Sequence, residues 1–269
     1  MAIIALHSAA TGLTALQTSL DVIANNLANS TTDGFKASRV NFQDLLYIEK
    51  ALAGTQNTNG DRRPTGLYVG LGTKVSGTQV DFRQGPARAT DRDLDVMIEG
   101  LGFFEVQIED DTGEGRAFTR AGNFTLNQDG ELVLGTDQGR RLIPIVQIDE
   151  TATAISISTD GVVSVLLPGQ IDPVVVETIQ LTTFINPGGL KQIGENLYIE
   201  TAASGDPVVG DPGENGRGLL RQSFLEASNV EPVIELVNLI RTQRAFEFNS
   251  QSIQAADEVL RSLGNLRRF

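Results

Sequence analysis

Apolar residues recur every seven positions in the first part of the chain, and further apolar residues lie three positions after several of them. This spacing is typical of the seam along which helices pack in a coiled coil. The seam positions are Leu6, Leu13, Leu16, Leu20, Ile23 and Leu27. The Asn-rich segment that follows, and then Asp33-Gly34, favour turn conformations. The pattern predicts a helix over residues 1–30 that ends abruptly.

A second heptad pattern occupies the end of the chain, from residue 236 to residue 266. Its apolar positions are Leu236, Leu239, Phe246, Ile253, Leu260 and Leu263. One such pattern alone fits an ordinary amphipathic helix equally well. Two terminal helices of the same period, separated by a long middle of different character, indicate that the ends pair with each other and with neighbouring molecules.

The middle of the chain has the short apolar runs of β-strands. These runs follow one another at intervals of about ten residues and are bounded by Gly, Asp or Pro. Asp129-Gly130 and Asp160-Gly161 lie between such runs and predict hairpin turns. Because no helical period intervenes, we expect an antiparallel β domain.

The segment between the first helix and these strands has a weaker pattern. Residues 35–53 contain several apolar residues that suggest a short helix, and residues 54–66 are polar turn-formers that predict a flexible connection. The predicted fold class is α+β, with a discontinuous coiled-coil domain of terminal α-helices and an inserted antiparallel all-β domain. The predicted segments are an N-terminal helix (1–32), a connecting segment (33–66), the β domain (67–220) and a C-terminal helix (221–269).

Composition excludes several classes of function. The 269 residues include no Cys and one His, and the net charge is −13. Disulfides and thiolate metal sites are therefore excluded. Residues 51–218 carry −12 of this charge, so an acidic, solvated middle joins two nearly neutral ends. Without a basic stripe, binding to nucleic acid is not expected.

The sequence contains neither a membrane span nor a secretory signal. No apolar run reaches the length of about 18 residues that a spanning helix needs. The N-terminus also lacks the basic segment, apolar core and cleavage site of a signal peptide. We therefore expect a soluble protein, or one exported by a route that leaves its N-terminus uncut.

The strongest candidate for catalytic chemistry is the alternating series Asp91, Asp93 and Asp95. In a strand these carboxylates would share one face, where they could serve acid–base catalysis or bind a cation. Arg88 and Arg92 are adjacent, however, and no second set of catalytic residues accompanies them. A solvated, salt-bridged edge is the better interpretation. No catalytic, cofactor or metal site is therefore predicted.

Several segments resemble the signatures of the bacterial flagellar rod and hook proteins. Residues 25–36 are similar to the N-terminal signature of that family, residues 94–104 and 118–124 to its β-domain signatures, and residues 225–230 and 243–249 to its second helical signature. The terminal signature residues are Asn25, Asn26, Asn29, Gly34, Phe35, Lys36, Ser228, Asn229, Gln243, Arg244 and Asn249. Independent motifs in the same order over nearly the whole chain make this resemblance more specific than any one motif.

Within this family, residues 66–72, 186–190 and 203–205 and the total length resemble the distal rod members. The resemblance implies a structural subunit without catalysis or cofactor, exported unfolded through the flagellar type III apparatus. Such subunits would polymerise helically into the hollow drive shaft that crosses the periplasm and transmits motor torque to the hook. The terminal helices would form the inner tube, and the segment after Gly34 would brace neighbouring subunits.

The implied partners are further copies of the chain, the proximal rod proteins, the hook protein, and the periplasmic and outer-membrane ring proteins. One alternative is a proximal rod subunit of the same family. An alternative from another class is a glycan-binding or glycan-cleaving β domain on a helical stalk, with the three alternating aspartates as its acids.

Two further expectations concern the ends of the chain. A turn so close to the first helix requires Gly34 to adopt a positive φ. The seam residues alone cannot offset the entropic cost of ordering two long helices. We therefore expect an isolated molecule in which the β domain is folded and the termini become ordered only when other subunits dock.

Overall fold

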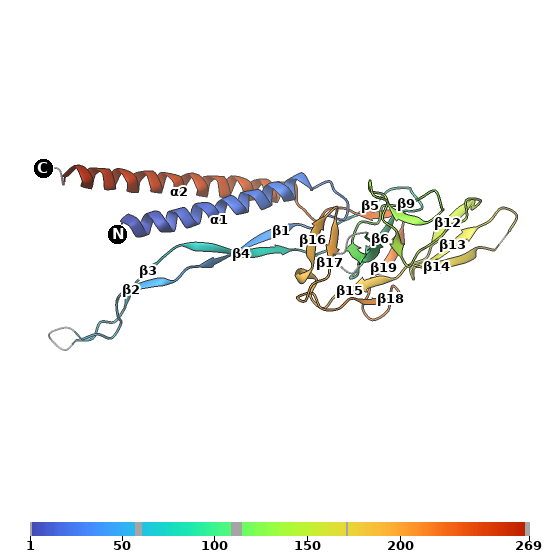
Figure 1. The fold of residues 1–269 in the computed structure, drawn as a ribbon, viewed down its shortest axis with the longest axis horizontal. Helices are drawn as coiled ribbons and strands as arrows, with labels where there is room; N and C mark the ends of the chain where they lie inside the picture. Colours follow the sequence, from blue (N-terminus) through green and yellow to red (C-terminus); the bar gives the residue numbers. More distant parts are fainter. Residues whose placement is uncertain (1, 57–60, 109–114, 171, 267–269) are drawn as a thin grey trace. The chain divides into compact units, whose positions relative to one another are not determined.

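The computed structural model describes residues 2–56, 61–108, 115–170 and 172–266. The chain forms two compact units, drawn together as a ribbon in Figure 1. Unit 1 comprises residues 1–28, 38–80 and 231–269, and unit 2 comprises residues 29–37 and 81–230. The predicted α+β class is confirmed, because a central antiparallel β-rich region lies between an N-terminal and a C-terminal helix in the sequence.

The chain passes between the two units four times. The crossings fall after residues 28, 37, 80 and 230. These boundaries divide the chain differently from the predicted segments: residues 29–37 belong to unit 2, residues 67–80 belong with the helices, and unit 2 extends beyond residue 220. Unit 2 thus includes residues 29–37 and 221–230, which the sequence prediction assigned to other segments.

Unit 1 consists of two long helices and a β-ribbon. Its elements are α1 (Ala2–Ala28), β1 (Ser38–Asp44), β2 (Tyr47–Ala51), β3 (Leu67–Gly70), β4 (Thr73–Val80) and α2 (Pro232–Leu266). Helices α1 and α2 pack against each other and run side by side in Figure 1. Helix α1 ends within the Asn-rich segment, as predicted. This packing alone does not show a coiled coil.

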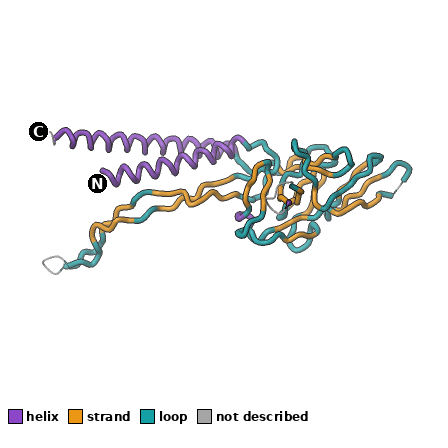
Figure 2. Tube along the Cα trace, viewed as in Figure 1, coloured by secondary structure: helices purple, strands orange, loops and turns teal. Residues whose placement is uncertain are grey.

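The ribbon of unit 1, here called the arm (residues 38–80), replaces the short helix predicted for residues 35–53, and that prediction is wrong. Strand β1 pairs antiparallel with β4, and β2 pairs with β3. Its four strands are orange in Figure 2, like all strands of the chain. The paired residues lie 16 to 42 positions apart in the sequence, so the local spacing of apolar residues could not reveal the pairing. Residues 57–60 of the predicted flexible connection lie outside the described residues.

Unit 2 is built from short antiparallel strands. The first of these are β5 (Ala87–Ala89), β6 (Val96–Glu99), β7 (Phe104–Gln107), β8 (Arg116–Thr119), β9 (Phe124–Leu126), β10 (Leu132–Leu134), β11 (Leu142–Ile143), β12 (Ala154–Ile157) and β13 (Val162–Leu166). They are followed by β14 (Val174–Thr178), β15 (Leu181–Thr183), the 3-10 helix η2 (Pro187–Gly189), β16 (Lys191–Gly194), β17 (Leu197–Ile199), β18 (Val208–Gly210), β19 (Leu219–Gln222) and β20 (Phe224–Glu226).

The strands of unit 2 form one larger sheet, a three-stranded sheet and several pairs. The larger sheet has the order β11-β7-β8-β17-β16, and the second has the order β12-β13-β14. The remaining pairs are β9 with β10, β15 with β18, β6 with β19, and β5 with β20. Strands β6 and β19 come from opposite ends of this unit, so the chain closes on itself before it leaves unit 2.

Both predicted hairpin turns are present. Strand β9 pairs with β10 around Asp129-Gly130, and β12 pairs with β13 around Asp160-Gly161. Gly130 has φ 76° and Gly161 has φ 87°, which glycine adopts without steric cost. In the first turn, the Asn127 side-chain oxygen accepts hydrogen bonds from the backbone of residues 129 and 131.

The core of unit 2 is one cluster of buried apolar residues from most of its strands. Its most deeply buried members include Val96, Ile98, Phe104, Val106, Phe124, Leu132, Leu134, Leu142, Ile179, Leu181, Leu197 and Leu220. Alternate strand residues supply most of them, as expected for strands with one face in the core. This continuous apolar core lets unit 2 fold around its own centre.

Candidate functional site: assembly surfaces and a polar joint

The predicted seam residues lie along the packed helices of unit 1 and are covered unevenly. Ile23 is buried and Leu236 is 48% exposed. The others are partly buried: Leu6, Leu13, Leu16, Leu20, Leu27, Leu239, Phe246, Ile253 and Leu260. Leu263 belongs to α2, but its side chain lies outside the described residues. A single helix pair therefore leaves much of the predicted seam accessible.

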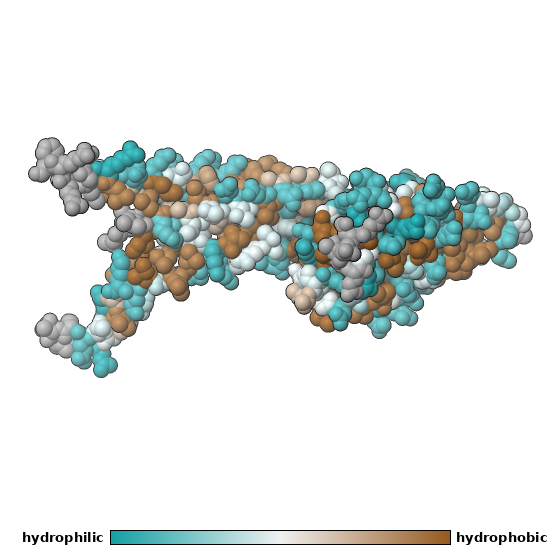
Figure 3. Space-filling view, in the orientation of Figure 1, coloured by the Kyte–Doolittle hydropathy of each residue, from teal (hydrophilic) through white to brown (hydrophobic). Residues whose placement is uncertain are grey.

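A second apolar face on α2 was not predicted from the sequence. Val233 is 76% exposed and Phe248 is 64% exposed, and Val237, Ile240 and Val259 are also exposed. At 100° per residue these five side chains share one side of the helix, roughly opposite Phe246 and Ile253. Figure 3 shows hydrophobic atoms in brown along the two helices. A helix that is apolar on two sides is normally enclosed by other helices.

The arm also exposes large apolar side chains. Leu46 is 82% exposed, and Tyr47, Leu52, Leu67 and Tyr68 are each at least half exposed. A two-stranded ribbon is at best marginally stable in water by itself. The arm therefore combines a weak fold with an apolar surface, which is a combination typical of an element that docks on another chain.

Side chains near the start of α1 form hydrogen bonds to the backbone of residues 70–73, where the arm passes from β3 to β4. The His7 ring nitrogen Nδ1 lies 3.2 Å from the Leu71 carbonyl oxygen, and the Ser8 hydroxyl donates to the Gly70 carbonyl. The Thr11 hydroxyl oxygen accepts from the Thr73 backbone N–H at 3.4 Å. His7, the one histidine of the chain, therefore lies at this junction.

The signature residues at the end of α1 hold the chain where it leaves the helix. In unit 1 the Asn26 side chain donates to the Ser38 carbonyl at 2.8 Å and accepts from the Ser38 N–H at 2.9 Å, which ties the helix to β1. In unit 2 the Asn29 side chain accepts from the Thr32 hydroxyl. Gly34 then has φ 73°, which confirms the predicted positive φ.

A buried group of three charged side chains, here called the neck cluster, lies beside Gly34 in unit 2. It comprises Lys36, Arg120 and Glu226, which are 0%, 3% and 2% exposed. The Lys36 ammonium is 2.5 Å from Glu226 Oε1, and Arg120 Nη1 is 3.4 Å from Glu226 Oε2. Burial lowers the pKa of Lys36 and of Arg120, while the Glu226 carboxylate opposes this change in both.

Asn229 complements the neck cluster with three hydrogen bonds to backbone. Its Oδ1 accepts from the Ala37 N–H at 2.8 Å, and its Nδ2 donates to the carbonyls of Asp81 and Arg83 at 2.8 and 3.0 Å. The N-terminal and C-terminal signatures, 190 residues apart at Lys36 and Glu226, therefore meet in one place. The sequence resemblance gave these residues without showing that they are neighbours.

The remaining signature residues have less distinctive surroundings. Phe35 and Ser228 are buried in unit 2, and Gln243 and Arg244 are exposed on α2. Asn25 is exposed near the end of α1. Asn249 lies on α2 where the two helices approach closely: a Cβ placed on Gly12 would be 3.2 Å from Asn249 Nδ2.

The alternating aspartates do not form a shared carboxylate face, so the strand placement considered for them is wrong. Asp91 has φ 57° and precedes a turn, Asp93 is exposed, and Asp95 is 1% exposed. Asp95 Oδ1 is 3.9 Å from Arg92 Nη1. Among the described residues, no group of three or more His, Cys, Asp or Glu side chains is arranged to hold a metal ion.

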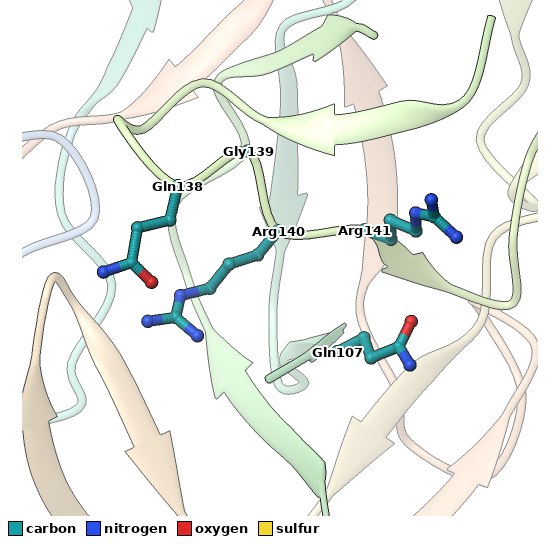
Figure 4. Close-up of a pocket in the computed structure, with 5 residues that line it drawn as sticks. All are labelled: Gln107, Gln138, Gly139, Arg140 and Arg141. Atoms are coloured by element: carbon teal, nitrogen blue, oxygen red, sulfur yellow. The ribbon is translucent and has the colours of Figure 1, made fainter. Parts of the chain in front are cut away.

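Unit 2 contains a polar cavity of about 630 Å³ (Figure 4), lined by Gln107, Gln138, Gly139, Arg140 and Arg141. Its two guanidinium groups already have carboxylate partners. Arg140 lies 3.1 Å from Glu195, and Arg141 lies 3.0 Å from Glu131. This pairing neutralises the two cations that line the cavity.

Three family profiles match successive parts of the chain. They are "Flagella basal body rod protein" over residues 6–36, "Flagellar hook protein FlgE/F/G D1 domain" over residues 97–165 and "Flagellar basal body rod FlgEFG protein C-terminal" over residues 221–266. Each matched segment contains one member of the neck cluster.

Full-length relatives decide between the rod proteins. The flagellar basal-body rod protein FlgG of Caulobacter vibrioides is 45% identical over 98% of this chain and 99% of its own length. FlgG of Buchnera aphidicola subsp. Acyrthosiphon pisum is 45% identical over 95% of this chain and 96% of its own length. This chain belongs to the FlgG family of flagellar basal-body rod proteins. FlgF of the same Caulobacter strain, also named a basal-body rod protein, is 32% identical over 92% of this chain and 91% of its own length.

Membership of the FlgG family identifies the structure to which this chain belongs. The chain is a structural subunit of the flagellar rod and belongs to the basal body. Assembly with other rod and hook components follows from this membership. Among the described residues, no helix is sufficiently long and apolar to cross a membrane.

Proposed function

We propose that copies of this chain polymerise helically through unit 1 into the hollow distal rod, the drive shaft that transmits motor torque to the hook. The observation that carries this proposal is the pair of apolar sides on α2. One side packs on α1 of the same chain, and the other exposes Val233, Val237, Ile240 and Phe248. Neighbouring copies would cover this second side, and the apolar surface of the arm would brace them.

The distribution of charge supports the same arrangement. Unit 1 has 9 acidic and 10 basic side chains, whereas unit 2 has 25 acidic and 11 basic side chains. A nearly neutral unit can pack closely against identical copies, because like charges do not accumulate there. Unit 2, with its net charge of −14, is suited to the water-facing outer layer of a rod.

In this proposal the rod crosses the periplasm, and the chain reaches it through the flagellar type III export apparatus without a cleaved signal peptide. Its partners are further copies of itself, the proximal rod proteins, the hook protein, and the periplasmic and outer-membrane ring proteins. The chain acts without catalysis, cofactor or membrane span. The two-sided apolar helix supports a role in assembly, because apolar sides of a helix are normally covered by other helices.

The substitution Phe248→Glu tests the proposal in cells that make this chain as their rod protein. A charge in an apolar contact between copies costs several kcal/mol, so we expect few rods and hooks by electron microscopy and loss of swimming. Ile185→Glu is the matched control, because Ile185 is 89% exposed in unit 2. Normal hooks and swimming in the Phe248→Glu strain would contradict the assignment of this face to assembly.

A further inference from the structure

Glu226 makes an ion pair or a hydrogen bond with residues 29–37 and with the segment after residue 81, and it belongs to the segment before residue 230. These are the segments of unit 2 that lead to the crossings between the units. Two of the crossings bound residues 29–37, one precedes residue 81, and one follows residue 230. The Glu226 carboxylate binds the Lys36 ammonium and accepts from the Gly85 N–H at 2.8 Å. Its backbone carbonyl accepts from the Gly34 N–H at 2.7 Å. Glu226 itself lies four residues before the last crossing.

Arg120 connects this arrangement to the body of unit 2. Its Nη1 contacts the Glu226 carboxylate, and its Nη2 donates to the Gly100 carbonyl at 2.8 Å. Its guanidinium carbon also lies 5.3 Å from the centre of the ring of Phe103, which is buried. The segments that lead to the crossings are therefore held both to one another and to the β-sheet core.

We propose that Glu226 is the positioning residue of a torque-bearing joint: it holds the segments leading to all four crossings in one fixed arrangement within unit 2. This inference rests on the proposed role in torque transmission and adds to it a residue and a mechanism. Four chain connections that could slide or rotate independently would yield under torque. Connections tied to one buried carboxylate, and through Arg120 to the sheet, must move together.

The chemistry of the cluster fits a positioning role better than a purely stabilising one. Buried ion pairs often contribute little net stability, because desolvation offsets their attraction, and apolar replacements can be as stable. Their distinctive property is geometry, since a charged hydrogen bond has a narrow range of distances and angles. Glu226 uses both carboxylate oxygens and its carbonyl, so small displacements of any segment disturb several bonds at once.

Hydrogen exchange on the purified full chain tests the local part of the inference. In Glu226→Gln the acceptor for the Gly85 N–H loses its charge, and Lys36 and Arg120 lose their carboxylate partner but keep their hydrogen bonds to the Arg83 and Gly100 carbonyls. We expect the Gly34 and Gly85 amides to exchange roughly tenfold faster or more, while the β13 amides stay unchanged. Glu105→Gln is the matched control, because Glu105 is 5% exposed and lies 3.7 Å from Arg116 inside the sheet, away from the crossings.

Lys36→Met decides the question if Glu226→Gln does not fold. This variant removes the Lys36 bonds to Glu226 and to the Arg83 carbonyl. It leaves Glu226 paired with Arg120 and Gly85, and Asn229 still donates to the Arg83 carbonyl. We expect faster exchange at Gly34 and unchanged exchange at Gly85. Wild-type exchange at Gly34 in this variant would overturn the inference, as would wild-type exchange at both amides in Glu226→Gln.

Swimming in media of increasing viscosity tests the mechanical part. Strains with Lys36→Met or Glu226→Gln should lose speed more steeply with viscosity than the wild type and the Glu105→Gln strain, with hooks still present. Wild-type speed at every viscosity in both variants would overturn the inference. Normal hooks in the Phe248→Glu strain, by contrast, would defeat the assembly proposal without affecting hydrogen exchange in the isolated chain.

Discussion

Replacing Gly34 by alanine should destabilise unit 2 more than the same replacement at another left-handed glycine. Gly34 has φ 73°, and a Cβ there would lie 2.7 Å from the Ala121 backbone nitrogen and 2.9 Å from the Ala121 Cα. The left-handed conformation costs a non-glycine residue about 1–2 kcal/mol. The overlap falls on backbone atoms that cannot rotate away, which adds about 1–3 kcal/mol. The expected loss is therefore about 2–5 kcal/mol.

Gly194 supplies the matched control, because it has φ 97° and a Cβ there would meet nothing within 4 Å. Gly194→Ala should therefore show only the conformational cost of about 1–2 kcal/mol. Urea unfolding of the purified chains, followed by circular dichroism, measures both free energies of unfolding. An equal loss in the two variants, or a smaller loss at Gly34, would refute the argument from close approach to residue 121.

Three further predictions concern the seam, the pH profile and the isolated chain. Leu20→Asp should place a charge in a helix contact at a cost of several kcal/mol. A Leu20→Asp strain with normal rods and normal swimming would rule out the assignment of Leu20 to the seam. Burial raises the pKa of Tyr198 to about 12, so this tyrosine loses its proton at a lower pH in the unfolded chain than in the folded one. The free energy of unfolding should therefore fall between pH 10 and pH 12. Tyr198→Phe should remove roughly 2 kcal/mol of this fall, measured by urea unfolding at each pH. In dilute monomer, amides 13–27 and 239–260 should exchange rapidly while the unit 2 core is protected; strong protection of the helices without oligomers would contradict assembly-coupled ordering.

The elements with local signals could be predicted from the sequence. The heptad spacing of Leu6 to Leu27 and the Asn-rich end located α1, and the Asp-Gly dipeptides located two hairpins. The positive φ of Gly34 followed from the need for a turn soon after the helix. These features depend on a few neighbouring residues, so the sequence alone contains the information.

Features that depend on distant partners could not be predicted. Residues 35–53, which include the first two strands of the arm, were predicted to form a short helix because their strand partners lie far along the chain. The neck cluster was missed for the same reason, since a charged residue such as Glu226 is normally exposed and its sequence neighbours do not reveal Lys36 or Arg120. The second apolar face of α2 was overlooked beside the stronger heptad pattern, although Val233, Val237 and Ile240 are visible in the sequence.

Cryo-electron microscopy of basal bodies from cells that produce this chain tests the account most directly. The account predicts that the distal rod is a helical array of this chain, with α1 and α2 lining the channel and unit 2 in the outer layer. The Val233, Val237 and Phe248 side chains should be covered by neighbouring copies. A rod in which this face of α2 lies open to solvent, or in which unit 2 lines the channel, would contradict the account.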